Sequence, residues 1–114
     1  MTTGVHSTLF RPPHGFHSPW LLRAAAERGL TCIGWSGNGS DWRNVTSAQI
    51  TDRIVKRARP GNIILLHDGL DLAHGVDRSR TVTALPIIID NLRDQGYRFV
   101  TIPELLGAGR AQPE

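Results

Sequence analysis

The hydrophobic residues of this 114-residue chain fall into short unbroken runs and into longer runs with helical spacing. A clear unbroken run covers residues 63–66 and ends at His67 and Asp68. Four aliphatic residues without polar alternation are typical of a strand covered on both faces, as in a parallel α/β sheet. Because such folds place their chemistry where strands end, His67 is the first candidate for a functional residue. A histidine that only hydrogen-bonds a neighbouring loop would give the same pattern.

Two segments in the first half space their apolar residues as amphipathic helices do. The first begins at Ser18, a residue type that caps helix N-termini, and ends at Gly29. The second begins at Thr46 and Gln49, which have the spacing of a capping box, and ends before residues 60–61. These signals predict two helices with defined starts.

A third helix is predicted after a polar loop over residues 68–80. Pro86 indicates that this helix begins near Thr83, because a proline in the first turn removes no helical hydrogen bond. Gly96 closes the helix. Residues 97–102, rich in aromatic and β-branched side chains, predict a final strand.

Two further strands are predicted, over residues 9–10 and residues 31–35. A loop stiffened by prolines follows the first, and residues 36–42 form a glycine-rich polar loop after the second. Residues 103–106 predict a short helical turn before a frayed C-terminal tail. Strands and helices therefore alternate, as in a parallel α/β sheet with right-handed crossovers.

In such a sheet the loops after the strands lie at one rim, and they carry Arg11, Asp41, Trp42 and His67. An imidazole beside a carboxylate can serve as a general acid, and an arginine can keep a second carboxylate ionised. The rim therefore predicts an acid–base site. A surface salt bridge and a capping histidine would explain the same residues without any chemistry.

Length, charge and composition mainly exclude some classes of partner and structure. A chain of this length buries about 65% of its unfolded surface, enough for one core. The formal charge of +3 is scattered, without a basic stripe or a reader motif, so no nucleic-acid partner is expected. No apolar run reaches the roughly eighteen residues of a membrane span, and the N-terminal residues lack a signal-peptide pattern. Cys32 is the single cysteine, so no internal disulfide can form.

Three ordered motifs resemble those of a known enzyme family. They are Phe10-Arg11-Pro12-Pro13-His14-Gly15, Asp41-Trp42 and Ile64-Leu65-Leu66-His67-Asp68. In this order they are similar to the third, fourth and fifth motifs of the polysaccharide deacetylases, the carbohydrate esterases with a NodB-homology domain. The stretches over residues 78–82 and 96–101 also resemble the C-terminal part of that family.

The resemblance implies a fold and an activity. The fold would be α/β, a partial, distorted (β/α) barrel of mainly parallel strands, with about four strands and three to four helices. Residues 1–107 would form the C-terminal half of a polysaccharide deacetylase domain, and residues 108–114 its tail. The activity would be that of a metal-dependent hydrolase, a carbohydrate N-deacetylase that removes acetyl groups from N-acetylglucosamine-type polysaccharides.

Catalytic roles are implied for three residues. Arg11 would orient the carboxylate that acts as base, and Asp41 would tune His67. His67 would be the general acid that gives a proton to the departing amine.

Substrate-binding roles are implied for three more residues. The main-chain N–H of His14, at a place usually filled by an aromatic residue, would help bind the oxyanion. Trp42 would wall the sugar groove, and Leu65 would line the pocket for the acetyl methyl group.

Two motifs of the family have no counterpart in this sequence. They are an Asp-Asp pair and a His-x-x-x-His arrangement, which supply the base and the ligands of the divalent metal, zinc or a similar ion, expected for the full-length family. We expect this chain to hold no metal, because His14 and His17 lie in a loop with proline and glycine. The resemblance begins near the third motif, so a truncated or excised half that is inactive alone is expected.

The expected partner is an N-acetylated polysaccharide or oligosaccharide. Pairing with a missing N-terminal half, or self-association, is expected at the strand edge near Phe10. The alternative is a non-catalytic carbohydrate-binding or interaction module, because Trp20, Trp35 and Trp42 could stack on sugars, although buried core tryptophans would explain them equally well. The family often works outside the cytoplasm, and this sequence leaves the compartment open.

Overall fold

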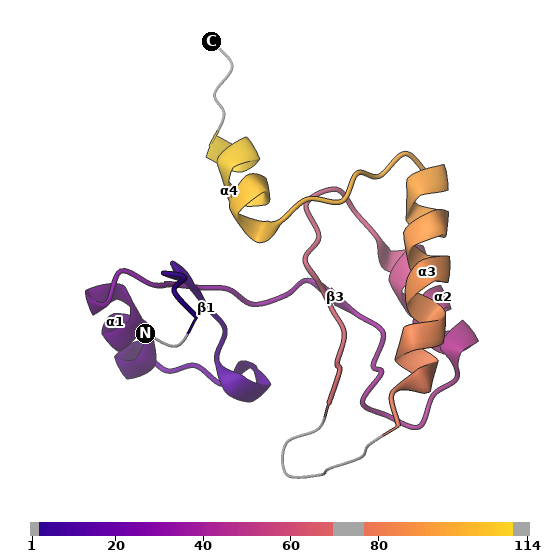
Figure 1. Ribbon diagram of the computed structural model, residues 1–114, viewed down its shortest axis with the longest axis horizontal. Coiled ribbons are helices and arrows are strands. Elements are labelled where there is room, and N and C mark those ends of the chain that lie inside the picture. The colour runs from indigo at the N-terminus through magenta and orange to yellow at the C-terminus, as the bar shows by residue number, and fades with distance from the viewer. Residues whose placement is uncertain (1–2, 70–76, 111–114) are drawn as a thin grey trace. The chain divides into compact units, whose positions relative to one another are not determined.

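The structure is a computed structural model that describes residues 3–69 and 77–110 of the chain. It divides into two compact units, Met1–Gly34 and Trp35–Glu114. In each unit a helix connects two parallel strands, which is the β-α-β arrangement of α/β folds (Figure 1).

The first unit contains β1 (Leu9–Phe10), the 3-10 helix η1 (Pro13–Gly15), α1 (Pro19–Glu27) and β2 (Thr31–Cys32). The two strands are parallel, with Leu9 opposite Thr31. The predicted cap of α1 is confirmed, because the Ser18 hydroxyl accepts a hydrogen bond from the N–H of Leu21 at 3.2 Å. The first predicted helix therefore begins where its cap residue indicated.

The second unit contains β3 (Gly37–Asn38), α2 (Ser47–Arg57), β4 (Ile64–Leu65), α3 (Ser79–Asp94) and α4 (Ile102–Arg110). β3 and β4 are parallel, with Asn38 opposite Leu65. The capping box predicted for α2 is confirmed: Thr46 accepts the N–H of Gln49, and the Gln49 side chain accepts the N–H of Thr46. These local signals set the start of α2.

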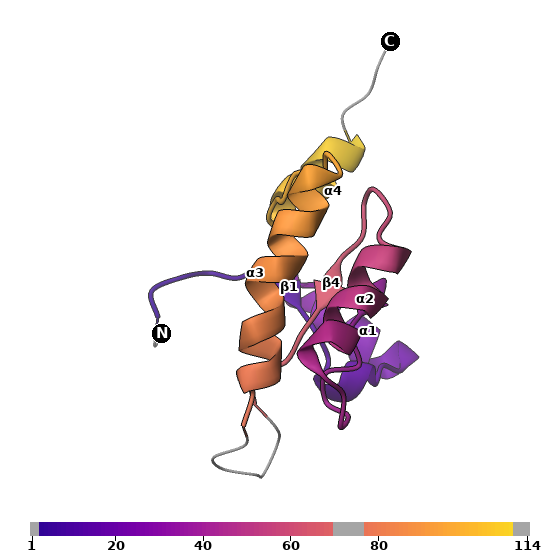
Figure 2. The same ribbon diagram turned by 90° about the vertical axis from the view of Figure 1, so that its right-hand side faces the viewer.

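The core of the second unit lies between α2 and α3, which run beside each other (Figure 2). Its helical members are Ile50, Ile54, Ala84, Ile88 and Leu92, each at most 3% exposed. Ile64 and Leu66, from β4 and its continuation, pack against this cluster. The core therefore joins both helices to the segment that leads to His67.

The strands differ from the sequence prediction in several places. β2 ends at Cys32 instead of residue 35, and β3 lies inside the predicted loop. Residues 97–101 form no ladder with any described residue, because residue types that favour strands give a strand only where a partner strand lies alongside. Residues 63–66 are half-buried rather than fully covered, since β4 pairs in the described chain only with β3.

Two helices also differ from the prediction. α3 begins at Ser79, one turn earlier than predicted, so Pro86 lies inside the helix. Asp77 accepts the N–H of Ser79 at 2.8 Å, which satisfies one donor of the earlier first turn. α4 is longer than the predicted turn and reaches Arg110, and residues 70–76 and 111–114, predicted as loop and tail, lie outside the described residues.

The elements together form a partial α/β arrangement of short parallel sheets. Residues 3–69 and 77–110 do not form a closed barrel. None of the helices among these residues has the length and apolar character needed to cross a membrane.

Candidate functional site

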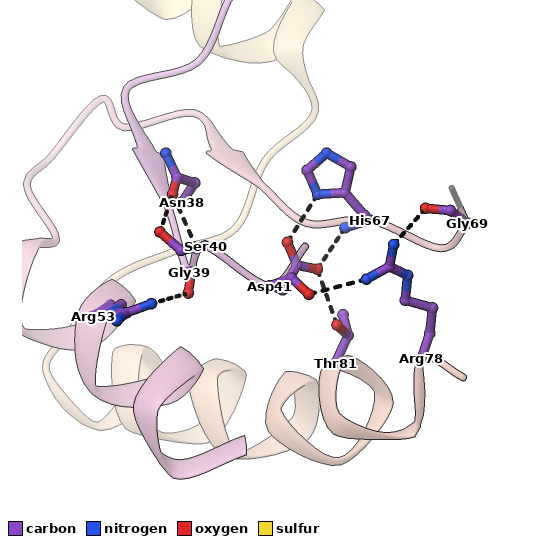
Figure 3. A network of polar contacts seen from close by, with 9 residues as sticks. All are labelled: Asn38, Gly39, Ser40, Asp41, Arg53, His67, Gly69, Arg78 and Thr81. Atoms are coloured by element: carbon purple, nitrogen blue, oxygen red, sulfur yellow. Dashed lines mark hydrogen bonds and ion pairs between the residues drawn. The ribbon is translucent and has the colours of Figure 1, made fainter. Parts of the chain in front are cut away.

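Asp41 and His67 come together just beyond the ends of β3 and β4. His67 Nδ1 lies 2.8 Å from Asp41 Oδ1, and the main-chain N–H of His67 donates a hydrogen bond to Asp41 Oδ2 at 2.7 Å (Figure 3). Because β3 and β4 are parallel, their C-terminal ends lie at the same edge. The predicted rim therefore brings this acid and this imidazole into contact.

A tight turn after β3 directs Asp41 into the protein. Asn38 Oδ1 accepts hydrogen bonds from the N–H and the hydroxyl of Ser40, at 3.0 and 3.3 Å. Ser40 has a φ of 53°, in the left-handed region that residues other than glycine rarely adopt. A Cβ at Gly39 would lie 2.6 Å from Cγ2 of Ile50 on α2, so only glycine fits at this position.

The Asp41 carboxylate is buried and binds three donors. Besides the two contacts with His67, Oδ2 accepts a hydrogen bond from the Thr81 hydroxyl at 2.9 Å. Burial acts to raise the pKa of Asp41, but the hydrogen bonds from His67 and Thr81 together hold this pKa below its ordinary value. The carboxylate is therefore ionised at neutral pH.

The contact with Asp41 determines which nitrogen of His67 exchanges protons. An ionised carboxylate can only accept hydrogen bonds, so we assign the proton of this contact to Nδ1. The other ring nitrogen, Nε2, points away from Asp41 (Figure 3). Nε2 is thus the atom of His67 that can gain and lose a proton.

Arg78, the residue before α3, completes the surroundings of Asp41. Arg78 donates hydrogen bonds to the main-chain oxygens of Asp41, at 3.0 Å, and of Gly69, at 2.8 Å. Neither Arg78 nor Thr81 was among the predicted site residues, because residues 68–80 were predicted as loop and Thr81 precedes the predicted helix start. One signal in the sequence could have found Thr81. It lies three positions before Ala84, on the buried face of α3, and it is the polar residue of that face.

Two other predicted site residues belong to the same unit. The ring of Trp42 lies edge-on to that of His67, with centroids 5.5 Å apart and planes at 72°. Leu65, on β4, is half-buried. Trp42, Trp20 and Trp35 are 44%, 76% and 36% exposed, so their interpretation as buried core residues is wrong.

The remaining two predicted site residues belong to the first unit and are described within it. Arg11 donates hydrogen bonds to the main-chain oxygens of Ile33, at 3.4 Å, and Gly34, at 3.0 Å. His14 is exposed in η1 with a φ of 57°, and its ring centroid lies 5.8 Å from that of Phe16. Arg11 is therefore tied to the chain that follows β2.

The described residues do not assemble a metal-binding group. Among residues 3–69 and 77–110, no three side chains of histidine, cysteine, aspartate or glutamate gather as ligands. In the loop that contains His14 and His17, the Nδ1 atom of His17 contacts the main-chain oxygen of Gly15 at 3.1 Å.

Comparison with known proteins identifies the family. No protein-family model matches the chain. A peptidoglycan-N-acetylglucosamine deacetylase of Bacillus cereus is 45% identical over 100 residues, which cover 86% of this chain and 45% of that protein. A chitooligosaccharide deacetylase of Sinorhizobium fredii is 36% identical over 99 residues, 82% of this chain and 46% of that protein. The chain belongs to the polysaccharide deacetylase family. It spans about half the length of these curated relatives.

Solved structures of the deacetylase family share the fold of this chain. The family 4 carbohydrate esterase of Streptomyces lividans, in complex with acetate, is 32% identical with a TM-score of 0.70 and covers 83% of this chain and 45% of that one. A family 4 pseudoenzyme of Bacillus anthracis is 28% identical with a TM-score of 0.79 and covers 91% of this chain and 34% of that one. Membership of the deacetylase family supports a divalent metal cofactor at the level of the family.

Proposed function

We propose that this chain supplies the proton-donating side of a metal-dependent carbohydrate N-deacetylase site. The observation that carries the proposal is the contact between Asp41 and His67, which leaves Nε2 of the ring directed away from the carboxylate. The substrates would be N-acetylglucosamine-type polysaccharides or oligosaccharides. This class is supported by the names of the relatives, a peptidoglycan-N-acetylglucosamine deacetylase and a chitooligosaccharide deacetylase.

In this proposal His67 is the general acid. The ionised carboxylate of Asp41 holds the Nδ1 proton and compensates the positive charge of the protonated ring. Nε2 then gives its proton to the amine nitrogen as the bond between this nitrogen and the acetyl carbon breaks. The products are a free amine on the sugar and acetate, which is the ligand of the Streptomyces lividans structure.

Four further residues complete the proposed site. Arg11 would orient the carboxylate that acts as base, and the main-chain N–H of His14 would help stabilise the oxyanion of the tetrahedral intermediate. Leu65 would line the pocket for the acetyl methyl group. Trp42 would wall the sugar groove, a role that its exposure and its position beside His67 support.

The complete domain, in this proposal, is a distorted (β/α) barrel of which this chain forms the C-terminal half. The described residues do not fit a divalent metal, because no set of three ligands gathers among them. We therefore assign no step to a metal held by this chain. The base and the metal ligands would come from a polypeptide segment that pairs with this half, and the chain alone would turn over little substrate.

A chimera tests this function. Replacing the matching part of the Bacillus cereus deacetylase by this chain should give a protein that releases acetate from chito-oligosaccharides. His67→Ala in the chimera should lower kcat by about 100-fold or more, as expected for loss of a general acid. His6→Ala, which removes an exposed histidine of the first unit, is the matched control and should leave turnover unchanged.

Two results would contradict the proposal. One is undiminished turnover in the His67→Ala chimera, which would remove His67 from the reaction. The other is full turnover by the purified 114-residue chain with zinc and substrate, which would show that no complementary half is needed.

A second candidate function is glycan binding without turnover. It is favoured by the exposure of Trp42 and by the similarity to a family 4 pseudoenzyme. Titration with chito-oligosaccharides should then give a saturable change in tryptophan fluorescence and no product. Trp42→Ala should abolish this change, whereas Trp20→Ala, in the first unit, should preserve it.

A further inference from the structure

The geometry points to Thr81, in the first turn of α3, and Arg78, which directly precedes this helix, as positioning residues that hold the Asp41–His67 pair in its working arrangement. They contact Asp41 from two sides, one at its carboxylate and one at its main chain. This inference rests on the proposed function, because it gives α3 a role in the same site.

Thr81 controls the orientation of the carboxylate. Its hydroxyl and the main-chain N–H of His67 both donate to Asp41 Oδ2, at 2.9 and 2.7 Å. Because the two oxygens of a carboxylate rotate together, the bonds at Oδ2 determine where Oδ1 points. In this arrangement Oδ1 faces His67 Nδ1. An apolar residue at position 81 would fill the volume of the threonine but remove one of the two hydrogen bonds at Oδ2 of the buried carboxylate.

Arg78 links the two segments that carry the pair. Its Nη1 binds the main-chain oxygen of Asp41, and its Nη2 binds that of Gly69, just beyond His67 (Figure 3). The planar guanidinium makes both bonds at once, which a lysine cannot do with the same geometry. The link holds the strand-end segments together independently of the contact between the two side chains.

The burial of the Nε atom of the half-buried Arg78 supports a positioning role. Its Nε is buried and has no hydrogen-bond partner among the described residues, which is unfavourable for a donor. A residue needed only to begin α3 could avoid this loss by remaining exposed, as Ser79 does.

Nitrogen NMR of the histidine ring in the full 114-residue chain tests this inference without metal or substrate. In the wild type, the neutral ring of His67 should carry its proton on Nδ1, which faces Asp41 Oδ1. Thr81→Val should lower the ratio of the Nδ1–H to the Nε2–H tautomer by about tenfold, as expected for loss of a buried hydrogen bond. Thr81→Ser should restore the wild-type ratio.

Arg78→Lys tests the second residue. It should lower the same tautomer ratio severalfold, because only one of the two main-chain oxygens can be bound. Thr83→Val on an exposed position of α3 and Arg57→Lys on α2 are matched controls, and both should give wild-type spectra.

The outcomes separate this inference from the proposed function. Wild-type His67 spectra in folded Thr81→Val and Arg78→Lys would overturn the inference. If Thr81→Val does not fold, Arg78→Lys decides alone: a changed ratio supports the positioning role and an unchanged ratio overturns it. A chimera that keeps its turnover with His67→Ala would instead refute the general-acid role and leave the tautomer result standing.

Discussion

Asp41 is a buried carboxylate on which burial and hydrogen bonding act in opposite directions. Burial raises its pKa, and the hydrogen bonds from His67 and Thr81 lower it further than burial raises it. A carboxylate whose pKa is lower in the folded than in the unfolded protein stabilises the fold at pH values above its unfolded-state pKa. This stabilisation is lost as the pH falls through the folded-state pKa.

The first prediction is a pH-dependent difference between the wild type and Asp41→Asn. The wild type should have the larger free energy of unfolding at pH 7, by about 1–3 kcal/mol, and the difference should shrink below about pH 4. Hydrogen bonds also lower the pKa values of Asp77 and Glu104. Both residues are present in the wild type and in Asp41→Asn, so their contributions cancel in the difference between the two proteins. Urea unfolding at several pH values measures the difference.

The matched control is Asp90→Asn, at an exposed position of α3, which should leave the free energy of unfolding nearly unchanged at pH 7. A difference between the wild type and Asp41→Asn that stays constant down to pH 3 would contradict the lowered pKa of Asp41.

Some residues of the site could be found from the sequence and others could not. Asp41 and His67 were predicted because strand ends gather at one edge of a parallel sheet, a rule that needs no coordinates. Gly39 could not be predicted, because its requirement depends on a 2.6 Å approach to Ile50. The contact of Thr81 spans forty positions of sequence, and its partner follows from the packing of α3 rather than from any local pattern.

At the scale of the helices, the contact between α2 and α3 holds the second unit together. Ile88 is 2% exposed in this contact, whereas its neighbour Ile87 is 46% exposed. Ile88→Ala should lower the free energy of unfolding by about 2–5 kcal/mol, because it leaves a cavity between the two helices. Ile87→Ala is the matched control and should lower it by less than about 1 kcal/mol. Equal losses in urea unfolding would contradict the packing described for α3.

Helix starts were predicted well where their signals are local. The caps at Ser18 and Thr46 act within one turn, so their spacing in the sequence is sufficient. The predicted start of α3 near Thr83 is wrong, because Pro86 lies inside the helix and its buried face begins already at Thr81. The strand predicted over residues 97–101 is also wrong. Residue types that favour strands form a ladder only beside a partner strand, and no described strand pairs with these residues.

At the scale of the whole molecule, the described chain exposes apolar residues that a complete deacetylase domain could cover. Val82 and Leu85 on α3, and Phe99 and Val100 after it, are between 39% and 69% exposed. The chain spans 45% of the Bacillus cereus relative. The alternation of strands and helices predicted a parallel α/β fold, and residues 3–69 and 77–110 form two pairs of parallel strands without a closed barrel.

The prediction at this scale is pairing between halves. When the remaining half of the Bacillus cereus deacetylase is added as a separate polypeptide, we expect a one-to-one complex in analytical ultracentrifugation. Hydrogen exchange should slow at residues 97–101, because a strand alongside them would accept their main-chain hydrogen bonds. A chain that forms only homo-oligomers under these conditions would instead support self-association.

The main-chain N–H of His67 binds Asp41 independently of the imidazole ring. Because every residue except proline has this N–H, His67→Gln keeps the main-chain hydrogen bond to Asp41 and loses the ring. The main-chain bond that shapes the loop and the ring proposed as proton donor are therefore separable at position 67. In the chimera proposed above, His67→Gln should keep the loop around Asp41 and lose turnover, which gives a variant suited to testing whether the complete domain binds acetylated glycan without processing it.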